Sequence, residues 1–268
     1  MIPVKTDEHG PDMAAVKQYV ESDPAVKGIW CVPVYTNPSG IVYSDDTVRA
    51  FAALKPAAAD FRIFWDNAYC VHHLVASPKK PLTINEACAE TGNTRIFYQF
   101  ASTSKITFPG AGVAVMNTAK ENLDELEKHL GIQTIGFDKT NMLRHVRYFG
   151  SADAVRAHME KHRAVLAPKF KVVLDTLEQE IAPLGIASWT KPEGGYFVSF
   201  NAPKGTAKRI VQLCKEGGVM LTGAGATWPY KNDPDDSNIR IAPTYPSPAE
   251  LAQAMELFCI AVKIAALE

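Results

Sequence analysis

Short apolar segments that alternate with amphipathic ones constrain the fold of this chain more than any other feature of its sequence. Residues 28–35, 61–65 and 95–100 are rich in β-branched and aromatic side chains, which is typical of strands buried on both faces of a sheet. Helix-like stretches separate them, and Ser44 can cap one that runs through Leu54. Strands that alternate with helices predict a mostly parallel sheet, and so an α/β fold.

After about Lys120 the pattern changes to longer helical stretches. Residues 121–130 and 139–148 are amphipathic, and a periodic segment from Ser151 to about Ile181 is long enough to connect two lobes. We therefore predict a large domain over residues 1–150 and a small α/β domain over 151–268 that includes the long connecting helix. The elements expected in the rest of the small domain are strands over 196–200, 219–222 and 238–242, a helix over 206–216, and a last helix that starts at the capping box of Ser247 and Glu250.

The charge balance and the cysteines argue against several classes of function. The 28 Lys and Arg residues nearly cancel the 29 Asp and Glu residues, so nothing electrostatic favours a nucleic-acid or membrane partner. No apolar run reaches the length of a bilayer span and the N-terminus has no secretory pattern, which predicts a cytoplasmic protein. Five scattered cysteines predict reduced thiols and no metal site; a catalytic thiol at Cys70 is the less favoured interpretation.

Polar residues follow the first two expected strands, at the carboxyl ends where parallel sheets bind ligands. Asn37 lies in an Asn-Pro-Ser-Gly run after the first strand; because these are common turn formers, a simple turn is the alternative. Asp66 directly follows the second strand, and Tyr69 comes shortly after it. Asp66 could cap the next segment or bind a cationic ligand group, whereas Tyr69 alone favours core packing.

Lys105 and Arg240 are charged residues in unusually apolar surroundings. Lys105 ends the hydroxyl-rich run Ser102-Thr103-Ser104 after the third strand, and residues 106–112 that follow it carry no charge, although a lysine is nearly always solvated. A lysine in such a place can serve as a nucleophile. Arg240 lies in the apolar run 238–242 after an acidic turn, so it could form a buried ion pair or clamp a substrate carboxylate.

Taken in chain order, these features resemble the fold-type I, class I aminotransferases. That family has the order Asn-Pro-Thr/Ser-Gly, Asp-x-x-Tyr, Ser-x-Ser-Lys and a C-terminal Arg, and all four occur here at plausible spacing. The resemblance covers essentially the whole chain, and residues 104–107 and 223–227 are most similar to the bacterial aspartate aminotransferase-like subgroup. It implies the aspartate aminotransferase fold, pyridoxal 5'-phosphate as the cofactor, and a site formed across a homodimer.

The resemblance also implies how the cofactor ring is held. Lys105 would carry the cofactor as a Schiff base and would move the proton between the substrate α-carbon and the cofactor. Asp66 would pair with the protonated pyridine nitrogen, which keeps the ring an electron sink. Asn37 and Tyr69 would hydrogen-bond the phenolic oxygen and so lower the pKa of the imine nitrogen.

Phosphate binding is where the sequence departs from the family. The resemblance implies that Ser102, and with less support Ser104, donates to the cofactor phosphate. Family members also place an arginine shortly after the lysine, but that position here is Val113, so hydroxyl groups such as that of Thr107 would have to contribute. The family has a further stretch ahead of the Asn-Pro-Ser-Gly strand, roughly a third of a full chain by length. We therefore expect a large domain truncated at its N-terminus, with impaired cofactor binding and activity.

The expected function is transamination between an amino acid and a 2-oxo acid. By resemblance, Arg240 would hold the substrate α-carboxylate with Asn37 beside it, and aspartate or glutamate is the leading amino-acid substrate. A pyridoxal-phosphate lyase that uses the same lysine and aspartate is one alternative. An aminotransferase-like effector domain of a transcription regulator and an inert fragment are alternatives of other classes.

Overall fold

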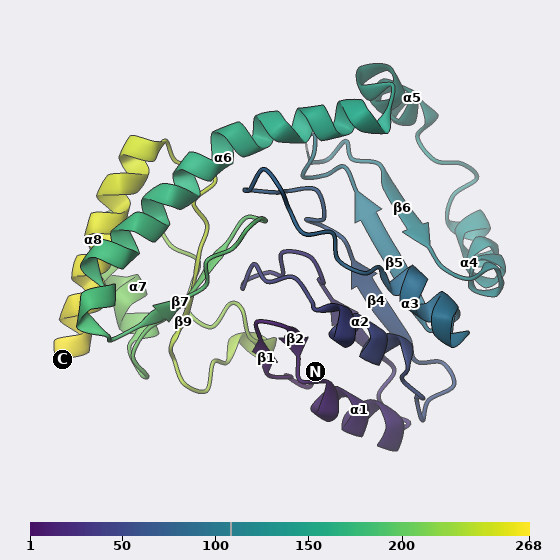
Figure 1. The fold of residues 1–268 in the computed structure, drawn as a ribbon, viewed down its shortest axis with the longest axis horizontal. Helices are drawn as coiled ribbons and strands as arrows, with labels where there is room; N and C mark the ends of the chain where they lie inside the picture. Colours follow the sequence, from purple (N-terminus) through teal and green to yellow (C-terminus); the bar gives the residue numbers. More distant parts are fainter. Residues whose placement is uncertain (108) are drawn as a thin grey trace.

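The computed structural model describes residues 1–107 and 109–268, and it has two parts joined by one long helix (Figure 1). The N-terminal part contains a four-stranded sheet, the C-terminal part contains a three-stranded sheet, and β1 and β2 form a separate two-stranded ribbon. The α-helices are α1 (Met13–Ser22), α2 (Asp45–Ala52), α3 (Ile84–Thr91), α4 (Lys120–Gln133), α5 (Lys139–Phe149), α6 (Ala152–Glu180), α7 (Ala207–Glu216) and α8 (Pro248–Leu267). The strands are β1 (Thr6–Asp7), β2 (Gly10–Pro11), β3 (Gly28–Cys31), β4 (Arg62–Asp66), β5 (Phe97–Ser102), β6 (Ala114–Asn117), β7 (Ser188–Trp189), β8 (Val198–Asn201) and β9 (Asn238–Ile241).

Three parallel strands form most of the larger sheet, as the alternating pattern predicts. β3, β4 and β5 pair in parallel and in that order, and β6 pairs antiparallel with β5. β3 is shorter than expected: it ends at Cys31, and Tyr35 has a φ of 55°, which no strand residue adopts. β4 and β5 extend further than expected, so Asp66 and Ser102 are the last residues of their strands.

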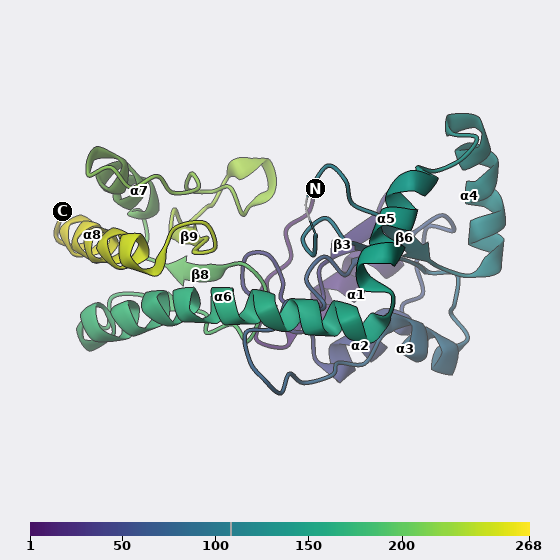
Figure 2. The ribbon, with the colours of Figure 1, turned by 90° about the horizontal axis from the view of Figure 1, so that it is seen from above.

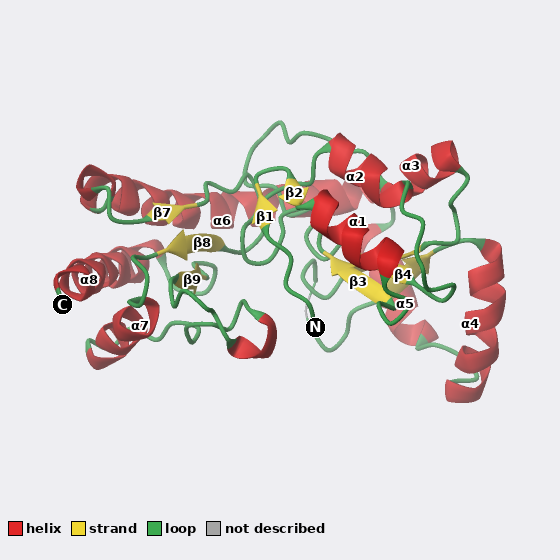
Figure 3. Ribbon diagram, turned by 90° about the horizontal axis from the view of Figure 1, so that it is seen from below, coloured by secondary structure: helices red, strands yellow, loops and turns green. Residues whose placement is uncertain are grey.

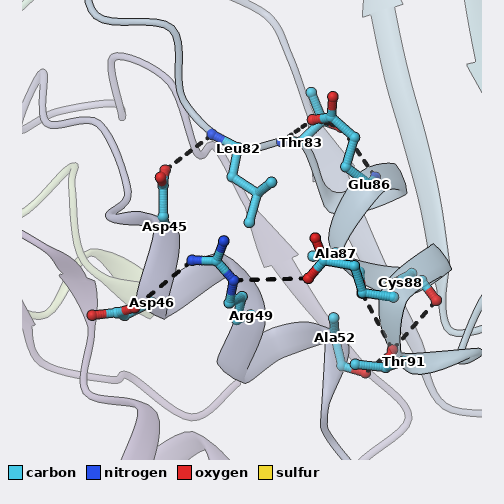
Figure 4. A network of polar contacts seen from close by, with 11 residues as sticks. Asp45, Asp46, Arg49, Ala52, Leu82, Thr83, Glu86, Ala87, Cys88 and Thr91 are labelled. Atoms are coloured by element: carbon cyan, nitrogen blue, oxygen red, sulfur yellow. Dashed lines mark hydrogen bonds and ion pairs between the residues drawn. The ribbon is translucent and has the colours of Figure 1, made fainter.

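Helices α1, α2 and α3 pack on one face of this sheet. α2 begins at the predicted cap, where the Ser44 hydroxyl accepts a hydrogen bond from the Thr47 N–H. Figure 4 shows α2 beside α3, where the Asp45 carboxylate accepts a hydrogen bond of 3.0 Å from the N–H of Leu82. The largest side chains fully buried between these helices and the sheet are Phe51, Phe61, Ile63, Ile84 and Phe97.

The opposite face of the sheet is less covered than the sequence indicates. The prediction of strands buried on both faces is wrong for β3, in which Trp30 is 64% exposed. The Trp30 ring stacks with those of Phe64 and Phe100 across the three parallel strands, at interplanar angles of 4° and 1°. Aromatic residues favour strands through contacts with their cross-strand neighbours, so an aromatic-rich strand is compatible with an exposed face as well as with a core.

The C-terminal part packs helices against an antiparallel sheet. β8 lies between β7 and β9 and is antiparallel to both (Figure 3). The capping box of Ser247 and Glu250 starts α8 as predicted. The strand predicted over residues 219–222 is wrong: Val219 and Leu221 pack against the C-terminal core, but their backbone pairs with no strand in the described residues. The core of this part contains Leu177, Phe200, Ile210 and Phe258, from α6, β8, α7 and α8.

Helix α6 connects the two parts, as the periodic segment predicts. The Ser151 hydroxyl caps it by accepting a hydrogen bond from the Ala154 N–H. The helix begins beside α5 and continues along the length of the molecule until it lies against α8 (Figures 1 and 2). Separate apolar clusters lie within residues 16–97 and 170–265, while a domain boundary at residue 150 stays a prediction. Within residues 1–107 and 109–268, no helix combines the length and apolar character needed to cross a bilayer.

Candidate active site

The candidate site lies at the carboxyl ends of the parallel strands. Asp66 ends β4 and pairs in register with Phe100 of the neighbouring strand β5, which ends at Ser102. Lys105 follows in a tight turn, in which the N–H groups of Ile106 and Thr107 both donate to the Thr103 carbonyl over 2.9 Å. Strand order and register therefore bring the predicted aspartate and lysine to the sheet edge where α/β proteins bind ligands.

Lys105 is held through both its side chain and its backbone. Its Nζ lies 5.0 Å from the centre of the Tyr69 ring. Its carbonyl oxygen contacts Nε2 of His72 at 2.9 Å and accepts a hydrogen bond of 3.1 Å from the Tyr196 hydroxyl. Because a carbonyl oxygen can only accept, Nε2 of His72 is the protonated nitrogen. The rings of Tyr69, His72 and Tyr196 pack against one another, so the lysine turn is held by a single aromatic cluster.

His72 and Tyr196 belong to this site, but the sequence singles out neither of them for a role in it. They lie 33 and 91 positions from Lys105, which no local pattern can connect. His72 is 3% exposed, and burial lowers its pKa while the hydrogen bond to the Lys105 carbonyl opposes that change. The imidazole is therefore held neutral, as a donor to the turn.

Backbone pairing joins the two parts of the molecule behind this cluster. The N–H of Gly195 donates to the His72 carbonyl and the N–H of Leu74 donates to the Glu193 carbonyl, both over 2.8 Å. Gly195 has a φ of 82°, and a Cβ atom on Gly194 would collide with the Tyr35 ring. The Gly-Gly-Tyr run is the one sequence signal that could have indicated this contact.

Arg240 reaches the same region from the C-terminal sheet. Its Nη1 donates to Oδ1 of Asn37 over 3.1 Å, and its guanidinium lies 4.5 Å from the centre of the Phe197 ring. The acidic turn does not neutralise it, because the Asp233 carboxylate accepts three backbone N–H groups of its own turn instead. The Nε of Arg240 is buried without a hydrogen-bond partner among the described residues. Of the two alternatives left by the sequence, this geometry favours the clamp for a ligand carboxylate.

The charges around Tyr69 suit pyridoxal phosphate. Burial raises the pKa of the Tyr69 hydroxyl, the Arg240 charge lowers it and the Asp66 charge raises it, so both charges act on this hydroxyl. No ion pair is formed by Asp66, Lys105 or Arg240 within the described part of the chain. A ring with a basic nitrogen, a phenolic oxygen and an aldehyde would match Asp66, the hydroxyl of Tyr69 and the amine of Lys105.

The hydroxyl groups expected at the phosphate are not equally available. The Ser102 hydroxyl accepts a hydrogen bond of 3.4 Å from the N–H of Ser104, and a Cβ atom on Gly112 would lie 2.6 Å from the Ser104 hydroxyl oxygen. The Thr107 hydroxyl donates to the Thr103 carbonyl over 3.1 Å, so its proton is not free. Val113 lies beside the turn, because its N–H donates to the Thr103 hydroxyl. Ser102 and Ser104 stay the candidate phosphate ligands.

The cysteine near the site, Cys70, is half-buried. All five cysteines are free thiols. Burial raises the pKa of Cys70, and the Asp66 charge adds to this effect. A raised pKa disfavours the thiolate, which supports the interpretation that Cys70 is not a nucleophile.

Comparisons with known proteins relate the chain to aminotransferases. A protein of Mycolicibacterium smegmatis that is named as an aminotransferase is 48% identical over 267 residues, which cover 100% of this chain and 62% of that protein. The aspartate aminotransferase of Corynebacterium glutamicum is 46% identical over 268 residues, which cover 100% of this chain and 62% of that protein. The chain thus spans 62% of the length of both relatives.

A solved structure and a family model extend the match to the fold. The crystal structure of an aspartate transaminase from Corynebacterium glutamicum superposes with a TM-score of 0.96 at 46% identity, covering 99% of this chain and 62% of that one. The model of the family described as aspartate aminotransferase matches residues 1–268. The chain therefore belongs to the aspartate aminotransferase family.

Proposed function

We propose that this chain is part of a pyridoxal-phosphate-dependent aminotransferase that moves an amino group between an amino acid and a 2-oxo acid. The observation that carries the proposal is the gathering of Lys105, Tyr69 and Asp66 at one sheet edge, with Arg240 reaching it from the other part of the molecule. The proposed partners are the two substrates and, for the assembled enzyme, a second copy of the protein.

The residues divide the work between cofactor and substrate. Lys105 would hold the cofactor covalently through Nζ, Asp66 would keep its pyridine nitrogen protonated, and the Tyr69 hydroxyl would donate to its phenolic oxygen. Bound pyridoxal phosphate supplies a ring that stabilises negative charge on the substrate α-carbon. Nζ of Lys105 would also take up the α-proton of the substrate and return it.

Arg240 and Asn37 would orient the substrate. A guanidinium binds a carboxylate through two parallel hydrogen bonds, and its stacking on Phe197 limits the directions in which it can approach one. The Asn37 side chain already accepts from Nη1 through Oδ1, so it can steady the guanidinium, and its NH2 group would be available to donate to the ligand. A dicarboxylic amino acid, aspartate or glutamate, is the proposed substrate, in keeping with the name of the Corynebacterium glutamicum relative.

The cofactor assignment is tested by reductive trapping. Purified protein is mixed with pyridoxal phosphate and reduced with borohydride, and the modified lysine is mapped by mass spectrometry. We expect a single site at Lys105, lost in Lys105→Ala and kept in the control Lys79→Ala. Labelling at another lysine, or none at all, contradicts the assignment.

Substrate binding is tested separately from cofactor attachment. Arg240→Ala should leave the trapped adduct at Lys105 intact while weakening aspartate binding by roughly tenfold or more, because a charge-assisted hydrogen bond contributes about 1.5–3 kcal/mol. Product analysis with aspartate and 2-oxoglutarate then distinguishes amino transfer from elimination. Release of the amino group without appearance of a new amino acid would point to a lyase instead.

A further inference from the structure

A cavity of about 370 Å³ lies behind the Lys105 turn, away from the residues assigned above. It is lined by Thr107, Arg144, His145, Tyr148, His158 and His162. These residues come from the turn after β5, from α5 and from the first turns of α6, which lie together in Figure 1. Neither Lys105 nor Asp66 nor Arg240 is among the lining residues, so this is a second site.

The lining is basic and contains no carboxylate. It consists of one arginine, three histidines and two hydroxyl-bearing residues. Arg144 forms neither an ion pair nor a side-chain hydrogen bond with any described residue, unlike Arg156 and Arg163 of the adjoining helix, which pair with Asp153 and Glu160. Arg144 is thus a cation without a counter-ion in the lining of a cavity that also contains hydrogen-bond donors, and such a lining favours an anionic ligand.

The histidines hydrogen-bond to the backbone and to one another, and they do not form a metal site within the described residues. Nε2 of His158 lies 2.9 Å from the Ile106 carbonyl oxygen, which can only accept, so this nitrogen carries a proton. Nε2 of His162 lies 3.1 Å from the same nitrogen and must therefore be the acceptor, which leaves the proton of neutral His162 on Nδ1. No group of three metal-ligating side chains suited to an ion occurs in the described residues.

His145 serves to build the wall of the cavity. Its Nδ1 lies 2.9 Å from the Asn141 carbonyl oxygen and its Nε2 lies 3.1 Å from the Thr103 hydroxyl oxygen, so both nitrogens already have partners. The groups left for a ligand are the guanidinium of Arg144, Nδ1–H of His162 and the hydroxyl of Tyr148. Three separate donor groups match the three terminal oxygens of a phosphate better than the two oxygens of a carboxylate.

We propose that this cavity binds a phosphate dianion, either free phosphate or the phosphate group of a small metabolite, through Arg144, His162 and Tyr148. The volume of about 370 Å³ is at the lower end of the range of small-molecule sites and leaves room for a few carbon atoms beyond the phosphate. Of the residues considered for the cofactor, only Thr107 lines the cavity, and its hydroxyl already donates to the Thr103 carbonyl, so the site does not depend on the proposed transaminase activity.

Isothermal titration calorimetry with inorganic phosphate and with glycerol 3-phosphate tests the proposal. Titrations are run at pH 7, where most of the phosphate monoester is dianionic. We expect Arg144→Gln to weaken binding by tenfold or more, and Tyr148→Phe to weaken it severalfold. Arg147→Gln is the matched control, because Arg147 is exposed on the same helix but does not line the cavity, and it should bind as the unaltered chain does.

The remaining arms identify the ligand. Tighter binding of glycerol 3-phosphate than of phosphate assigns the site to a phosphate ester, and the reverse assigns it to free phosphate. The affinity of the cavity for phosphate should be the same whether or not the Lys105 site is first loaded with pyridoxal phosphate. If pyridoxal phosphate does not bind, the titration of the unloaded chain still tests the proposal. Absence of binding, equal binding by Arg144→Gln, or equally tight binding of succinate would overturn the proposal.

Discussion

The double hydrogen bond on the Lys105 carbonyl predicts a measurable coupling between His72 and Tyr196. Tyr196→Phe removes one donor but leaves the other, so the carbonyl stays satisfied and the free energy of unfolding should fall by about 1 kcal/mol. His72→Leu removes the other donor and adds a packing change. Removing both donors leaves the Lys105 carbonyl without any hydrogen-bond partner beside a buried position. This costs about 1–3 kcal/mol beyond the loss of the two hydrogen bonds themselves.

The double variant should therefore lose about 1–3 kcal/mol more than the sum of the two single losses. The packing change at position 72 occurs in both backgrounds and cancels in the cycle. Urea unfolding is followed by far-UV circular dichroism and by tryptophan fluorescence, and coincident transitions are needed before free energies are compared. The control cycle pairs Tyr196→Phe with His73→Leu, because His73 contacts the Tyr35 hydroxyl instead. Losses that add to within about 0.4 kcal/mol for His72 and Tyr196 would refute the shared clamp.

Two further predictions concern pH and packing at the same junction. Burial lowers the pKa of His72, so below about pH 6.5 the unfolded chain binds a proton at this residue more readily than the folded chain does. The stabilisation from neutral His72 should therefore be complete above that pH and decrease below it. His72→Gln should reduce the difference between the urea midpoints measured at pH 7.5 and at pH 5.5. If the variant loses as much stability on acidification as the unaltered chain, His72 is not the group responsible. Gly194→Ala should lower the free energy of unfolding by about 1–3 kcal/mol, because the new Cβ atom would collide with the buried Tyr35 ring. Gly223→Ala is its control, since nothing lies within 4 Å of a Cβ atom there, and thermal melts in which the two variants match would contradict the steric reasoning.

The parts of the fold that the sequence predicts are those set by local chemistry. Ser44 and Ser247 cap helices because a side-chain oxygen lies within reach of N–H groups in the next turn, and that information is contained in a few adjacent residues. Helix α6 follows from periodicity in the same way. The predicted strand over residues 219–222 is wrong because apolar alternation reports burial of side chains, and it does not report whether a partner strand exists.

The site residues likewise fall into those that the sequence predicts and those that it does not. Lys105, Asp66 and Asn37 follow expected strands, and the family order of motifs joins them to Tyr69 and Arg240. The sequence does not predict His72 and Tyr196 as site residues, because a histidine and a tyrosine in apolar runs are ordinary core residues. Only the pairing of residues 72–74 with 193–195 brings their donors to one carbonyl, and that pairing crosses between the two parts of the molecule.

Arg240 illustrates how a structure can argue against the alternative that the sequence alone favours. The acidic turn before β9 offers three nearby carboxylates, so an internal ion pair is the natural expectation for an arginine in an apolar strand. Instead, the Asp233 carboxylate accepts hydrogen bonds of 3.0, 2.8 and 2.9 Å from three backbone N–H groups of this turn. A carboxylate engaged in this way holds the turn in shape, and it forms no ion pair with the arginine. Among the described residues the guanidinium contacts only uncharged groups, Asn37, Thr222 and the Phe197 ring, so its positive charge remains available for the proposed substrate carboxylate.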